Sequence, residues 1–151
     1  MRVMAMTALV ASGLVFHACG GNADDEGSGS VSLRVSSVEE LEIPEEGTPG
    51  ERLEALWSQT RPLVERDAGA GYDDAEYQAR RQPIWRAWTS LQMSVAGEDD
   101  RVSEIIPRVL ELINQVYGWT AFSPEERAKK RSNKARTAGL IEEIDQEIGK
   151  L

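Results

Sequence analysis

The feature that most constrains the fold is the spacing of apolar residues from Glu51 onward, which alternates between three and four positions. This spacing places apolar side chains on one face of an α-helix. Residues 67–71 end the first predicted helix, and Asp73 or Asp74 caps the second. Gly97 ends the second helix, and Asp99 or Asp100 opens the third. The apolar faces of the first three predicted helices carry Leu53, Leu56, Trp57, Thr60, Leu63, Val64, Tyr77, Arg81, Ile84, Trp88, Leu91, Val95, Val102, Ile105, Ile106, Val109, Leu110, Ile113, Val116 and Tyr117.

A fourth predicted helix has the clearest start in the chain. Ser123 supplies an N-cap, Pro124 occupies the first helical position, and Glu126 completes a capping box. The first half of this helix is polar, and its last part, from Leu140 on, is strongly amphipathic. Gly139 is the position at which this helix could bend or split.

Pro62, Pro83 and Pro107 each lie inside one of the first three predicted helices. An internal proline removes a backbone hydrogen bond and costs about 3 kcal/mol in a regular helix. We therefore expect kinks or breaks at these positions, which argue against a long straight coiled coil. The predicted fold is all-α, a compact bundle of three or four proline-kinked helices.

The segment before the predicted helices is acidic and rich in turn-forming residues. Residues 20–51 hold nine acidic residues and one basic residue, whereas residues 52–151 hold 17 acidic and 15 basic residues. Residues 20–30 contain only small and polar or acidic types, which cannot form a core. We expect a signal segment over 1–18, a disordered acidic tether over 19–50 and a helical domain over 51–151.

Two features of the predicted tether allow another interpretation. Residues 31–35 alternate as in a strand, and a capping box from Ser37 to Glu40 favours one helical turn near Leu41. A short binding peptide around residues 31–43 is the alternative to a solvated spacer.

The N-terminus has the organisation of an export signal. Arg2 supplies positive charge, and the apolar residues 3–16 follow it. As a helix, that stretch spans about 21 Å, which is short against roughly 30 Å of membrane hydrocarbon. Ala18 and Cys19 come next, and Cys19 is the only cysteine in the chain.

The sequence around Cys19 resembles the lipobox of bacterial lipoproteins. Ala18, Cys19 and the following glycines match that pattern, whereas Phe16 and His17 replace the usual leucine and small residue. The resemblance implies cleavage before Cys19 and acylation of its sulfur and new amino group, which would anchor the chain to a membrane. It favours the outer membrane if the host has one. The alternative is an ordinary signal peptide cut near Ala18 that releases the protein.

This processing would remove much catalytic chemistry. His17 is the only histidine and lies in the segment predicted to be cleaved, while the one thiol would be acylated. A Ser–His or Cys–His nucleophile pair and the usual Cys/His zinc sites are therefore excluded from the mature chain. We predict no cofactor and no metal. The acidic tether and the exported location argue against a nucleic acid partner.

Two sets of residues are candidates for an interaction surface. Trp57 and Trp88 fall on apolar faces and are expected in the core, whereas Trp85 and Trp119 could line a groove for a glycan or a peptide. A run of basic residues in the fourth helix could bind phosphate groups, lipid head groups, an acidic partner or the chain's own tether, or form a solvated face: Arg127, Lys129, Lys130, Arg131, Lys134 and Arg136.

These observations predict a membrane-anchored lipoprotein of the cell envelope that acts as a non-enzymatic interaction or accessory protein, with an envelope protein as its partner. Two alternatives belong to other classes. One is a small cell-wall glycan hydrolase with a Glu/Asp pair, drawn from the acidic clusters at residues 98–100 and 142–147. The other is a periplasmic helical chaperone or stress sensor.

Overall fold

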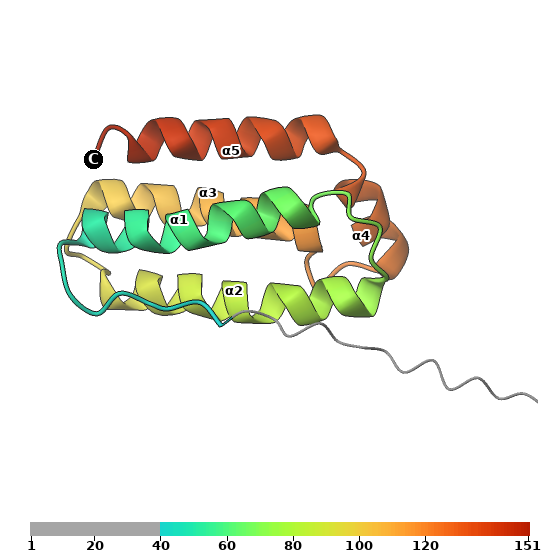
Figure 1. Ribbon diagram of the computed structural model, residues 1–151, viewed down its shortest axis with the longest axis horizontal. Coiled ribbons are helices and arrows are strands. Elements are labelled where there is room, and N and C mark those ends of the chain that lie inside the picture. Colours follow the sequence, from blue (N-terminus) through green and yellow to red (C-terminus); the bar gives the residue numbers. More distant parts are fainter. Residues whose placement is uncertain (1–39) are drawn as a thin grey trace, which may run out of the picture. The chain divides into compact units, whose positions relative to one another are not determined.

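A computed structural model describes residues 40–151, and the predicted signal segment, Cys19 and the tether up to residue 39 lie outside that part. The described chain is all-α, as predicted, with five helices and no strand. These are α1 (Pro49–Asp67), α2 (Asp74–Ser94), α3 (Asp100–Tyr117), α4 (Pro124–Arg131) and α5 (Lys134–Ile148). Figure 1 shows α1, α2, α3 and α5 alongside one another, with α4 across the end where α1 leads into α2.

Each helix begins at a side chain that caps its first free amides. Asp73 accepts a hydrogen bond from the Glu76 amide, and Asp99 accepts two from the first turn of α3. Ser123 forms the predicted capping box of α4. A second capping box, which the sequence analysis missed, opens α1 and begins at Thr48. The helix starts are thus determined by local hydrogen bonding.

The three internal prolines do not break their helices, so of the kinks or breaks expected there, no break occurs. Helices α1, α2 and α3 each run continuously through their proline. Pro62 and Pro107 lie on the exposed side, and so do Ser58 and Ser103, whose carbonyls lose a helical donor. Water can bond those two carbonyls in place of the missing helical donor. Packing of the opposite, buried face then keeps each helix continuous through its proline.

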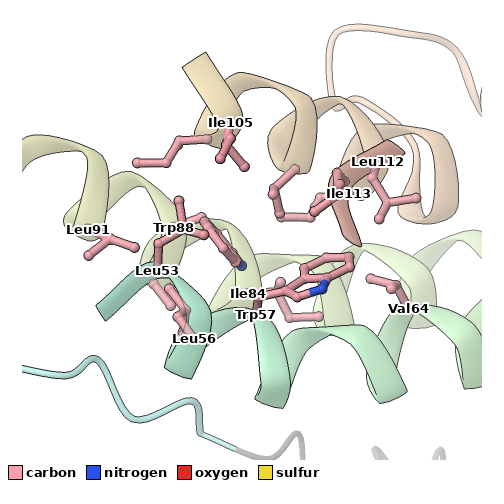
Figure 2. Packing of buried hydrophobic residues seen from close by; sticks show 14 of the residues in the cluster. Leu53, Leu56, Trp57, Val64, Ile84, Trp88, Leu91, Ile105, Leu112 and Ile113 are labelled. Carbon is pink, nitrogen blue, oxygen red and sulfur yellow. The ribbon is translucent and has the colours of Figure 1, made fainter. Parts of the chain in front are cut away.

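The core forms where α1, α2, α3 and α5 meet, and α3 is central because it contacts all four other helices. Figure 2 shows side chains of α1, α2 and α3 converging, with Trp57 and Trp88 among them. Trp88 is fully buried and its Nε1 donates to Thr60 Oγ1 at 2.9 Å, while Thr60 Oγ1 donates to the Leu56 carbonyl. Trp57 is also buried, with 5% of its surface exposed, so the core prediction is confirmed for both tryptophans.

The predicted fourth helix is two helices, and the division is not at Gly139. Helix α4 ends at Arg131, and Asn133 caps α5 by accepting a hydrogen bond from the Arg136 amide. Gly139 lies inside α5 with open space where a Cβ would be. The break lets α4 cross the end of the bundle while α5 returns along α3 (Figure 1).

Residues 40–48 lie against α1 and contain no helical turn, while most of the capping box expected to open a turn near Leu41 lies outside the described residues. Gln59 bonds both backbone groups of Glu42, each at 3.0 Å. Arg52 Nε donates to the Pro44 carbonyl at 2.8 Å, and Leu41 packs on the core. This described end of the expected tether is therefore attached to the helical domain.

Candidate functional site

Two members of the basic run are bound within the protein. The guanidinium groups of Arg127 and Arg131 both pair with Asp74 at the start of α2, and Arg131 also lies over the Tyr77 ring. The hydrogen bond from Arg127 lowers the pKa of Asp74, and the same bond raises the pKa of Arg127. These two arginines therefore attach α4 to α2.

The other four basic residues of the run each lie in a different environment. Arg136 pairs with Glu111 at 2.6 Å, which raises the pKa of Arg136. The Lys130 ammonium lies 4.6 Å from the centre of the Phe122 ring, and the Lys134 side chain runs beside Gly69. Lys129 is exposed in the last turn of α4. The run is therefore not a single cationic surface within the part of the chain that the structure describes.

Trp85 and Trp119 are not brought together in one groove. Trp85 is half-buried beneath Arg81, whose guanidinium carbon lies 4.1 Å from the ring centre. Arg81 also donates to Asn114 Oδ1 at 2.9 Å, which ties α2 to α3. Trp119 follows α3, is 46% exposed, and makes an edge-to-face contact with Phe122 at 5.1 Å between ring centres.

Trp119 lines a groove between α3 and α4 of about 400 Å³. Its walls combine apolar and polar side chains: Pro107, Leu110, Glu111, Asn114, Gln115, Trp119, Phe122 and Lys130. Gly118 makes the turn into this groove with a φ of 86°, where a Cβ would lie 2.6 Å from Arg127 Cδ. The groove thus depends on the close approach of α4 to the end of α3.

A second groove of about 460 Å³ runs between α1 and α5. Small and apolar residues, including Ala68 and Ile141, lie between charged residues on both helices. Asp145 accepts a hydrogen bond from Trp57 Nε1 at 2.8 Å and pairs with Arg61 at 3.1 Å. Of the acids in the 142–147 cluster, Glu142 and Asp145 therefore line this groove, and Asp145 is occupied by protein donors.

The sequence analysis missed a buried charge at the end of α1. Asp67 is 1% exposed and accepts hydrogen bonds from Tyr117 Oη at 2.9 Å, Tyr72 Oη at 3.3 Å and Arg66 Nε at 3.0 Å. Burial and the Asp67 carboxylate raise the pKa of Tyr117. Asp67 lies three positions after Val64 on the apolar face of α1, a placement that could have indicated its burial.

Two further findings concern ions and membranes. Among residues 40–151, no three cysteine, histidine or acidic side chains are grouped so that they could hold a metal ion. No helix in the same range combines the length and apolar character needed to cross a bilayer.

No protein-family model, no curated protein and no solved structure matches this chain. The α3–α4 groove is therefore the candidate site on its own geometry.

Proposed function

We propose that this chain is an exported lipoprotein, anchored through acylated Cys19, whose helical domain acts in the cell envelope by non-covalent binding. The anchor is supported by Arg2, the apolar residues 3–16 and the Ala18–Cys19 step. Several acyl chains on one residue give a stable anchor, whereas a single chain binds only marginally. The tether then keeps the domain close to the membrane surface.

The α3–α4 groove is the observation that supports binding as the activity. Trp119 offers an exposed ring, and the polar side chains beside it are fixed by bonds to other parts of the protein. Ligand sites combine apolar surface with a few placed polar groups in this way. Most of the groove lining comes from the core helix α3, while Trp119 and Phe122 lie in the loop between α3 and α4 and Lys130 lies in α4.

The geometry favours binding over the glycan hydrolase alternative. A carboxylate hydrolase needs an acid that can donate its proton to the substrate and a second carboxylate at a fixed separation. In the α1–α5 groove, Asp145 Oδ1 accepts from Trp57 and Oδ2 pairs with Arg61. Arg61 also pairs with Glu65 at 3.3 Å. Both oxygens of Asp145 are therefore used to hold α1 against α5.

Mass spectrometry of the mature N-terminus, combined with membrane fractionation, tests the anchor. We expect a first residue of acylated Cys19 and a protein found in the membrane fraction. Cys19→Ala should move the protein to the soluble fraction. His17→Ser, which brings a small residue to that position, is the matched control and should leave both readouts unchanged. An unmodified N-terminus on a freely diffusing wild-type protein would refute the anchor.

Binding is tested with envelope extracts. Cross-linking of the anchored protein should recover the same envelope component repeatedly, and Trp119→Ala should reduce the yield. A chaperone would instead suppress aggregation of a denatured client at substoichiometric or equal ratios, irrespective of Trp119. Turnover of cell-wall glycan by the purified protein would overturn the non-enzymatic assignment.

A further inference from the structure

The α3–α4 groove contains an aromatic ring that is only partly covered by the rest of the fold. Trp119 is 46% exposed, and its contact with Phe122 has an angle of 88° between the ring planes. An edge-to-face contact covers at most one face of the indole, so the other face is left without Phe122. Indole faces attract positively polarised hydrogens, which includes the C–H groups of a sugar ring.

Two amides beside this ring are fixed in position and retain free hydrogen-bonding groups. Asn114 Oδ1 accepts from Arg81, and Gln115 Nε2 donates to the Lys130 carbonyl. Within residues 40–151, the Asn114 amino group and the Gln115 oxygen have no protein hydrogen bond. Both residues line the groove, which therefore offers one free donor and one free acceptor, the two groups that the carbonyl and the N–H of an acetamide require.

The charged residues of the groove argue for a neutral ligand. Glu111 is paired with Arg136 at 2.6 Å, and the Lys130 ammonium lies over the Phe122 ring. The groove therefore presents one acid, Glu111, that is neutralised by Arg136, and one base, Lys130, that already contacts an aromatic ring. Neither sign of charge dominates, which disfavours both anionic and cationic ligands.

The extent of this ring argues for a small ligand rather than a folded protein partner. Stable protein interfaces bury roughly 800 Å² on each side. Of the four large hydrophobic side chains exposed in the described chain, Trp119 alone belongs to this groove. Met93 lies in the last turn of α2, and Leu151 is the C-terminal residue, at the other end of the bundle (Figure 1). A cavity of about 400 Å³ suits a short oligomer.

We propose that the α3–α4 groove binds a neutral glycan of N-acetylated hexosamines, with one pyranose ring on the free face of Trp119 and an acetamide between Asn114 and Gln115. This deepens the binding function proposed above and rests on it. No bond is made or broken in this interaction. Glu111 and Lys130 border the site without a charged partner in the ligand.

The test is a calorimetric titration of the purified full-length protein with a soluble β-1,4-linked tetramer of N-acetylglucosamine. We expect saturable binding, and Trp119→Ala should weaken it at least about tenfold, or 1.4 kcal/mol. Met93→Ala removes an exposed apolar side chain elsewhere and is the matched control. It should leave the affinity unchanged.

A second variant tests the amide contact without disturbing the ring. Asn114→Asp keeps an acceptor for Arg81 but removes the amino group, so it should weaken tetramer binding while circular dichroism stays that of the wild type. A matched tetramer of unacetylated glucose should bind more weakly than the acetylated one.

Each contrary outcome is distinct. The proposal fails if the acetylated tetramer does not bind saturably, if Trp119→Ala binds as well as wild type, or if a peptide occupies the groove and the glycan does not compete. The anchor is scored separately by the mass of the N-terminal peptide. A protein that is not acylated but still binds the tetramer would overturn the lipoprotein proposal and leave the glycan-binding proposal standing.

Discussion

At the scale of single residues, buried polar groups fix how the helices of the core are placed against one another. Trp88 and Thr60 are both fully buried, and the indole donates to the threonine hydroxyl. Asp67 binds two tyrosines and an arginine at the end of α1. A buried polar group left without its partner costs about 1–3 kcal/mol, more than a satisfied bond contributes. These residues therefore fix how α1, α2 and α3 meet.

Replacing Thr60 by valine tests the first of these contacts. Thr60→Val keeps the shape of the side chain but leaves Trp88 Nε1 without an acceptor, so the free energy of unfolding should fall by about 1–3 kcal/mol. Chemical denaturation measures this change. Thr89→Val is the control, because Thr89 bonds only carbonyls of its own helix. A loss of equal size in both variants would contradict the special role of the indole contact.

The buried phenol of Tyr117 should make stability depend on alkaline pH. Its pKa is raised above the ordinary value of 10.0 by burial and by Asp67. The unfolded chain therefore loses this proton at lower pH than the folded chain, and stability falls as pH rises above 10. The slope from one such group is at most about 1.4 kcal/mol per pH unit.

Denaturation curves of wild type and Tyr117→Phe between pH 8 and about 11 would measure that difference. The variant should lack the Tyr117 part of the alkaline slope, although it also loses the bond to Asp67 at neutral pH. Parallel pH profiles for the two proteins would show that Tyr117 does not titrate with unfolding.

At the scale of elements, the link between α3 and α4 depends on one glycine. Gly118 caps α3 with a positive φ of 86°. A Cβ there would lie within 2.9 Å of three Arg127 side-chain carbons, including Arg127 Cβ itself. That arginine is held by Asp74 and cannot move away freely. Helix α4 can therefore approach α3 only because residue 118 lacks a side chain.

Paired alanine substitutions separate backbone strain from the clash. Gly97 has a similar φ of 80° but open space around it, so Gly97→Ala should cost about 1–2 kcal/mol from backbone strain alone. Gly118→Ala should cost at least about 1 kcal/mol more, because the packed neighbours must shift. Thermal unfolding of both variants gives the comparison. Equal losses would mean that Arg127 moves aside without cost.

At the scale of the whole molecule, Asp74 connects the helical bundle to α4 and so to the candidate groove. Its carboxylate pairs with Arg127 and Arg131 of α4, whereas Lys130 of α4 and Phe122, just before that helix, line the groove. The pKa of Asp74 is lowered from 3.8, chiefly by the hydrogen bond from Arg127. The contact is therefore complete above that pH and is lost as pH falls through the lower, folded-state pKa.

Hydrogen exchange of the α4 amides tests this coupling. Asp74→Asn should accelerate exchange in α4 while α3 remains protected, and it should weaken glycan binding in the groove. Acidification should lower the protection of the α4 amides, measured relative to their intrinsic exchange rate at each pH, in wild type but change it little in the variant. Asp73→Asn is the control, because asparagine caps a helix as well as aspartate. Unchanged α4 exchange in Asp74→Asn would contradict the coupling.

Some of the fold could be predicted because its causes are local. The starts of α2, α3 and α4 were predicted at Asp73 or Asp74, at Asp99 or Asp100, and at Ser123. The structure places the caps at Asp73, Asp99 and Ser123, and each cap bonds amides two or three residues away. The burial of Trp57 and Trp88 followed from the helical period. The capping box at Thr48 is equally local, and it places the start of α1 at Pro49, two residues before the expected start at Glu51.

Local sequence therefore determined the helical class, most of the helix starts and the tryptophans of the core, because caps and apolar spacing act within one or two turns. Only the tertiary structure decided which charges are structural. Arg127 and Asp74 are 53 positions apart, so no local pattern could separate Arg127 from the freer Lys129 beside it in the run. The division at Asn133 and the groove at Trp119 likewise required α4 to pack across the end of the bundle, where distant residues first come into contact.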